Sequence, residues 1–136
     1  MRNILFLSLL GFLSACTATH NDPNFGFTAA FGVSPDSEVT VYRGKLWESR
    51  HLLVFSEYYA LAEFSASDQK VAALMGGTKK KFQPFDGTNF GFSEKPDERW
   101  FAPKDGSNYV GWSSDEGMYV VRSSRTGHVF VWRSEL

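Results

Sequence analysis

Hydrophobic and polar residues alternate most regularly in the last third of the chain. Segments 108–112, 117–122 and 128–133 are rich in Val, Tyr, Phe and Trp, and two polar connections, 113–116 and 123–127, separate them. The connections contain Ser, Asp, Thr and Gly, which favour tight turns. Short strands joined by such turns form antiparallel hairpins. The pattern therefore predicts a three-stranded antiparallel meander at the C-terminal end.

Two more strands are expected earlier in the sequence. Segment 38–43 alternates and is rich in β-branched residues, and Gly44 is expected to end it. Segment 52–64 carries apolar side chains at both odd and even positions, which is typical of a central strand that is buried on both faces. A helix around 58–63 also fits this segment. We prefer the strand, because a better helix start follows it.

One helix is expected between these strands and the meander. Ser67 can cap a helix over 68–75, and Asp68 is favourable in the first turn because of the helix dipole. Gly76-Gly77 is expected to end this helix. Segment 79–106 then contains three prolines and reads as a loop, but it also holds six rings and is expected to pack as a cover over the sheet. These rings are Phe82, Phe85, Phe90, Phe92, Trp100 and Phe101.

Together these elements predict a small single α+β domain. It contains an antiparallel sheet of about five or six strands, with one helix on one face and the three-stranded meander at the C-terminus. Runs of strands around a single helix favour this arrangement over a parallel sheet.

The first fifteen residues have the composition of a secretory signal. Arg2 gives a positive start, residues 4–13 form an apolar run, and Ser14-Ala15 supply small residues at the exit. Ten helical residues span about half of the ~30 Å hydrocarbon core of a bilayer, so this run is too short for a stable membrane span. Residues 1–15 are therefore interpreted as a cleaved signal peptide.

Leu13-Ser14-Ala15-Cys16 resembles the bacterial lipobox, the site that the lipoprotein signal peptidase reads. In that family the cysteine thiol receives a diacylglyceryl group, the peptide before it is cut, and the new amino end is usually acylated too, with fatty acids such as palmitate. Stable attachment needs more than one acyl chain, and a multiply acylated cysteine meets this requirement. The resemblance implies a membrane anchor on Cys16.

Residues 16–24 are expected to form a short lipidated tether, because they are polar and Asn21-Asp22-Pro23 reads as a turn signal. Residues 25–136 would then form the globular domain. In the lipoprotein family the residue after the cysteine influences sorting, and Thr17 is not the aspartate associated with retention in the inner membrane. The resemblance therefore favours the outer membrane, facing the periplasm, over the inner membrane.

The charge balance argues against nucleic acid as a partner. The chain has 14 Lys and Arg and 15 Asp and Glu, for a net charge of −1, and loss of Arg2 with the signal makes it −2. Cys16 is the only cysteine, so the domain has no internal disulfide. The expected partners are the membrane, through the lipid on Cys16, and a protein of the cell envelope.

Catalytic and metal-binding patterns are not visible in the sequence. His20, His51 and His128 lie too far apart for a short-spaced metal motif, and no cofactor motif or Gly-x-Ser-x-Gly elbow occurs. Glu57 and Glu63 are the candidates for an acid pair that could cleave a glycan, with solvent-facing positions as the simpler interpretation. We expect no cofactor, no metal and no catalytic site.

Aromatic residues suggest a binding surface instead. Twenty rings remain after the signal is removed, and most are expected to fill the core. The four tryptophans and a run of three lysines after the helix are the candidates for an exposed interaction surface. These residues are Trp47, Trp100, Trp112, Trp132, Lys79, Lys80 and Lys81.

Three functions fit these observations. The first is an envelope lipoprotein whose domain binds another macromolecule without catalysis, for example as an inhibitor or an immunity-type protein. The second is a small envelope enzyme that acts on peptidoglycan or another glycan, with Glu57 or Glu63 as its acid. The third is a structural or assembly factor of an outer-membrane complex.

Overall fold

A computed structural model describes residues 16–50, 56–86 and 108–135 of the chain. The strands in these ranges are β1 (Cys16–His20), β2 (Thr40–Arg50), β3 (Ser56–Ser65), β4 (Phe82–Asp86), β5 (Tyr109–Ser114), β6 (Met118–Ser123) and β7 (His128–Glu135). The helices are α1 (Pro23–Phe31) and α2 (Asp68–Gly77).

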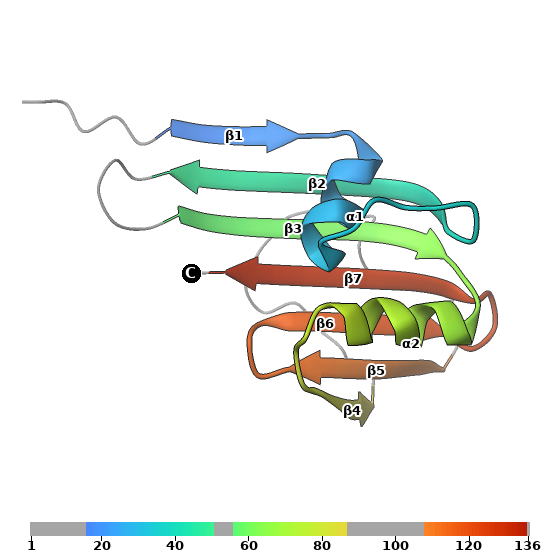
Figure 1. Ribbon diagram of the computed structural model, residues 1–136. Coiled ribbons are helices and arrows are strands. Elements are labelled where there is room, and N and C mark those ends of the chain that lie inside the picture. Colours follow the sequence, from blue (N-terminus) through green and yellow to red (C-terminus); the bar gives the residue numbers. More distant parts are fainter. Residues whose placement is uncertain (1–15, 51–55, 87–107, 136) are drawn as a thin grey trace, which may run out of the picture.

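All the strands form one antiparallel sheet in the order β1-β2-β3-β7-β6-β5-β4, and both helices lie on the same face of it (Figure 1). The mixed α+β class and the C-terminal meander of β5, β6 and β7 are confirmed. The expected count was wrong: the described residues contain seven strands and two helices, rather than five or six strands and one helix.

The segment expected to be an irregular tether is instead part of the fold. β1 pairs with β2 from its first residue, with Cys16 opposite Arg50 and His20 opposite Leu46. Helix α1 begins only three residues after β1 ends. The prediction was wrong because β1 lacks the apolar alternation of a buried strand: three of its five residues, Thr17, Ala18 and Thr19, are exposed at the sheet edge.

Asp22-Pro23 is a helix start rather than a turn. The Asp22 side chain accepts a hydrogen bond from the backbone N–H of Asn24, and Pro23 occupies the first turn, where its missing N–H leaves no helical bond unmade. Gly32 ends α1 in the left-handed conformation with φ 75°, a conformation that residues with a Cβ rarely adopt.

Helix α1 packs directly on the backbone of the sheet. A Cβ on Gly26 would overlap the carbonyl oxygen of Leu61 in β3, and a Cβ on Gly44 would overlap the carbonyl oxygen of Pro23. Gly44 therefore does not end β2, as the sequence suggested. It lies within a strand that continues to Arg50, because its missing side chain leaves room for α1.

The start of helix α2 matches its prediction, since the Ser67 hydroxyl accepts from the N–H of Lys70, but Gly76 and Gly77 lie within the helix and Thr78 is its C-cap. β3 confirms the strand expected over 52–64 where it is described, and residues 51–55 lie outside the described ranges. The expected loop over 79–106 contains β4, an edge strand that includes Pro84. Proline is tolerated there because one side of an edge strand needs no ladder hydrogen bonds.

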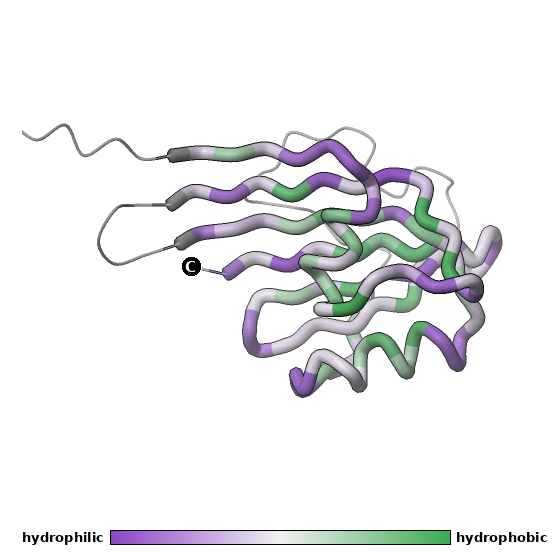
Figure 2. The backbone as a smooth tube through the Cα atoms, turned by 45° about the horizontal axis from the view of Figure 1, so that its top comes forward, coloured by the Kyte–Doolittle hydropathy of each residue, from purple (hydrophilic) through white to green (hydrophobic). Residues whose placement is uncertain are grey.

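The core lies between the helices and the sheet. Figure 2 shows the apolar stretches of the strands gathered beneath the two helices, and more polar stretches toward the end of the sheet where β1 begins. Phe64 of β3 is fully buried, with its ring edge-on to Phe27 and Phe31 of α1 at centroid distances of 5.2 and 5.6 Å. Leu61 and Phe130 are buried on the opposite face of the sheet.

Arg133 of β7 fixes the end of α1. Its Nη1 donates to the carbonyl oxygens of Ala29 and Ala30 at 3.3 and 3.0 Å, where the helix dipole favours a cation. Its guanidinium also lies 5.6 Å from the ring centre of Tyr58. Burial, together with the hydrogen bond to Glu135, raises the pKa of Tyr58 above its ordinary value, so this hydroxyl stays protonated at neutral pH.

No helix in the described parts of the chain is long and apolar enough to span a membrane.

The contact of α1 with the sheet generates a prediction about two helical glycines. Gly26→Ala should destabilise the fold by about 3 kcal/mol, because the new methyl group forces the helix away from β3. Gly76→Ala in α2 meets no atom within 4 Å and should stabilise the fold by up to about 1 kcal/mol through helix propensity. Urea denaturation followed by circular dichroism measures both, and equal effects of the two variants would contradict this packing.

Candidate functional site

Within residues 16–50, 56–86 and 108–135, the two helices leave part of the sheet uncovered. Seven strands at about 4.8 Å spacing span about 29 Å, whereas two helices of about 10 Å diameter cover about 20 Å. Helix α1 lies over β2 and β3, and α2 lies beside β6 and β5 (Figure 1). The uncovered width on the α2 side leaves a groove between this helix and strand β5.

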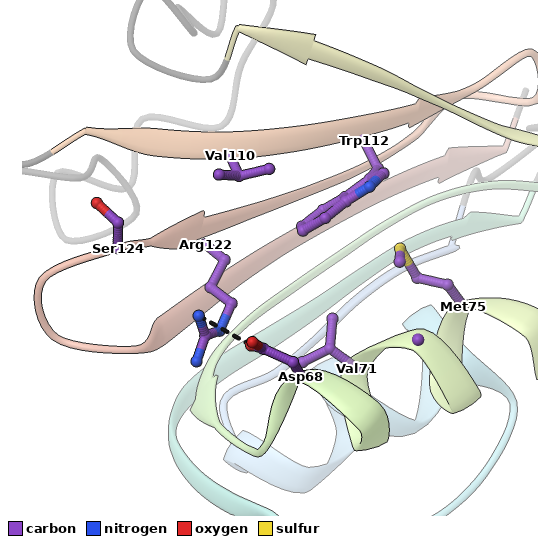
Figure 3. A pocket seen from close by; sticks show the side chains of 8 residues that line it. Asp68, Val71, Met75, Val110, Trp112, Arg122 and Ser124 are labelled. Atoms are coloured by element: carbon purple, nitrogen blue, oxygen red, sulfur yellow. Dashed lines mark ion pairs between the residues drawn. The ribbon is translucent and has the colours of Figure 1, made fainter.

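The groove is largely apolar and has a volume of about 370 Å³. The Trp112 ring of β5 lies between strand and helix, with Met75 and Val71 of α2 opposite it and Val110 beside it (Figure 3). Val110 is 48% exposed at the edge of the groove. A volume in this range is typical of sites that hold a small molecule or a few side chains.

One end of the groove is polar. Arg122 of β6 forms an ion pair with Asp68, with 2.9 Å between Nη1 and Oδ1, and Ser124 lies close by (Figure 3). The guanidinium has five N–H donors, and its buried Nε makes no hydrogen bond within the described parts of the chain. The groove therefore combines an apolar floor with the charged groups of Arg122 and Asp68 at one end.

The tryptophans named from the sequence do not share one surface. Trp112 lines the groove on the helix face. Trp132 and Trp47 are half-buried on the opposite face, where Trp132 stacks on Tyr119 with ring centres 5.3 Å apart and Trp47 lies against Tyr59 at the same distance. Trp100 lies outside the described residues.

The three lysines also diverge. Lys79 and Lys81 are exposed, and Lys79 has the left-handed φ of 61° that turns the chain after α2. The side chain of Lys80 is only 5% exposed and pairs with Glu116. This pair lines a second hollow with Ser134 and Glu135, where the cation is already neutralised, so the run does not form one basic patch.

Glu63 and His128 form a network that the sequence did not reveal. The Glu63 carboxylate is buried and lies 2.8 Å from Arg43 Nε and 2.9 Å from His128 Nδ1. The imidazole of His128 is partly exposed and stacks on Tyr42 at 4.7 Å. Oε1 of this carboxylate is hydrogen-bonded to the imidazole and orients it, and Oε2 forms an ion pair with Arg43, so Glu63 is not the solvent-facing side chain that the sequence suggested.

Glu57 and Glu63 do not form an acid pair. They lie on the same strand six residues apart, which corresponds to about 20 Å at 3.4 Å per residue. Two-carboxylate glycosidases need separations of about 5 to 9.5 Å.

The other two histidines named from the sequence are His20 and His51. His20 lies in β1 with its Nε2 3.7 Å from Glu48, and His51 falls outside the described residues.

No cluster of three His, Cys, Asp or Glu side chains that could hold a metal ion occurs in the described ranges. A cofactor site is likewise not apparent among these residues.

Comparisons of the chain with family models, with curated proteins and with solved structures found no match.

The network around Glu63 predicts a difference between two glutamates on one strand. Glu63→Gln should destabilise the fold by about 2 kcal/mol at pH 7, because it removes a buried charge that Arg43 and His128 contact. Glu57→Gln, at a half-exposed position of the same strand and face, should change stability by less than about 0.5 kcal/mol. Urea denaturation distinguishes them, and a Glu63→Gln protein as stable as the wild type would refute the network.

Proposed function

We propose that this chain is a lipid-anchored protein of the bacterial cell envelope whose domain binds another protein without catalysis. The anchor is lipid on Cys16, and the binding site is the groove of Trp112 between α2 and β5. An inhibitor or immunity-type role fits such a domain. The residue after the cysteine, Thr17, favours the outer membrane with the domain in the periplasm.

The binding proposal rests on the groove between α2 and β5. Its apolar floor can bury one large side chain of a partner, and Trp112 supplies the rigid ring that is typical of binding hot spots. Burial of a single Leu, Phe or Met side chain contributes about 1.5–3 kcal/mol, which makes the groove a focus of a larger interface.

The polar end of the groove indicates which partner segment fits. Arg122 places a guanidinium beside an apolar floor, so an apolar side chain followed by a carboxylate or a free backbone carbonyl would match both parts. An acidic peptide segment of a partner protein with one large apolar residue has this chemistry. Nucleic acid does not fit this site, because its phosphates need several unpaired cations and Asp68 neutralises the charge of Arg122.

The lipid anchor can be tested by replacing Cys16, the residue proposed to carry the lipid. In bacteria that express the full chain, Cys16→Ala should leave uncut precursor and abolish labelling by radioactive fatty acid, because the thiol that carries the lipid is absent. Ser14→Ala, which keeps a small residue before the cysteine, should still be labelled. Continued labelling of Cys16→Ala would contradict the anchor.

A test of the groove uses two exposed valines. A soluble domain that starts at Thr17 should capture one stoichiometric partner from an envelope extract, and Val110→Lys should abolish this capture because it places a charge on the groove. Val33→Lys should retain the partner, since Val33 is 51% exposed in the loop after α1, away from the groove.

Two results would contradict the proposal. One is equal capture by both valine variants. The other is turnover of purified cell wall by the soluble domain that is lost in Glu63→Gln or His128→Gln, which would replace binding with catalysis by the oriented imidazole.

A further inference from the structure

Four strand ends meet at one end of the sheet, here called the anchor end. It comprises the start of β1, the end of β2, the start of β3 and the end of β7. Cys16 is opposite Arg50, Arg50 is opposite Ser56, and Tyr58 is opposite Glu135. Figure 1 shows that β1, β2 and β3 extend beyond both helices at this end.

The residue of the proposed lipid anchor is itself part of the sheet. β1 pairs with β2 from Cys16 onward, so no flexible residue separates the anchor from the folded domain. A flexible tether of ten residues would reach about 17 Å from the bilayer on average, whereas each residue of a strand adds a fixed rise of about 3.4 Å. With lipid on Cys16, the anchor end must therefore lie at the height of the lipid headgroups.

The described side chains at this end suit that position. Thr17, Ala18 and Thr19 are exposed and uncharged. The half-buried rings of Trp47 and Tyr59 lie 5.3 Å apart within three residues of the strand ends. Trp and Tyr are the residues that favour the boundary between hydrocarbon and water, because each combines a ring with a polar group.

Glu48 and Glu57 also lie near this end, and both are partly exposed. Because a charged side chain is costly within the hydrocarbon, the acids limit the contact to the hydrated headgroup layer.

We propose that the anchor end rests on phospholipid headgroups, so that the strands lead away from the bilayer and present the polar end of the groove to the periplasm. This orientation rests on the proposed lipid anchor. β2 runs for 11 residues, about 35 Å, from Arg50 at the membrane to Thr40 at the far end. Asp68 and Arg122 lie toward that far end, because Thr40 is opposite Ser65 and Arg122 is opposite Val129.

Spin labels on the lipidated full-length protein can measure this orientation. Cys16 is the only cysteine of the chain, so once its sulfur carries lipid, an introduced cysteine is the only free thiol. Ala18→Cys places a nitroxide at the anchor end, and Ser124→Cys places the matched label at the far end; both positions are exposed. The labelled proteins are inserted into vesicles of phosphatidylethanolamine and phosphatidylcholine.

The depth of each label is measured by its collision rates with two reagents. One is a nickel chelate that stays in water, and the other is oxygen, which concentrates in the bilayer. The Ala18 label should collide severalfold less with the chelate and more with oxygen than the Ser124 label. The same contrast is expected for Thr19→Cys, which serves if Ala18→Cys does not fold. Equal collision rates at the two ends would overturn the orientation.

Fatty acid labelling of the same preparations separates the two proposals. If Cys16 is labelled but both ends meet the chelate equally, the orientation is wrong and the anchor stands. If Cys16 carries no fatty acid, the anchor is wrong and the orientation falls with it.

Discussion

The pairing of β1 with β2 is the interaction on which the rest of this account depends. It begins at Cys16, runs to His20 opposite Leu46, and is followed at once by α1. Because of this register, residues 16–20 form an edge of the sheet rather than a flexible tether. The lipid that we propose on Cys16 would therefore hold this end of the sheet at a defined height above the membrane.

A second constraint is the mismatch between seven strands and two short helices. Helix α1 covers its part of the sheet closely because Gly26 and Gly44 remove the side chains that would hold it off. In the part of the chain that the structure describes, helix α2 does not reach far enough to cover β5, so Trp112 and Val110 line a groove beside it. The groove is thus a direct result of how the helix face is covered, and its polar end is supplied by Asp68 and Arg122.

Capping residues, alternation and turn residues correctly predicted the elements that depend mainly on their own sequence. Ser67 and Asp68 identified α2, and alternation with turn residues identified the meander. Helix α1 was missed for two reasons. Asp22-Pro23 can begin either a turn or a helix, and Gly26 lowers the helix propensity of the segment although the fold needs it where α1 contacts β3. Gly44 was misinterpreted for the same reason, since only the folded chain shows that Pro23 lies against it.

The candidate site was less predictable than the fold. Trp112 was named, but its groove is formed by residues of α2, β5 and β6, and no spacing in the sequence indicates that they meet. Glu63 and His128 are 65 positions apart and adjoin only because β3 and β7 are neighbours in the sheet. Strand order, which single segments do not encode, decides such contacts.

The proposed membrane anchor depends on the chemistry of Cys16, the first residue of β1. Mass spectrometry of the N-terminal peptide, taken from the mature protein in native membranes, is the most direct measurement of it. The predicted peptide starts at Cys16 and carries the mass of a diacylglyceryl group, with a further acyl chain on its amino end. A peptide with an unmodified sulfur, or one that starts at another residue, would contradict the account.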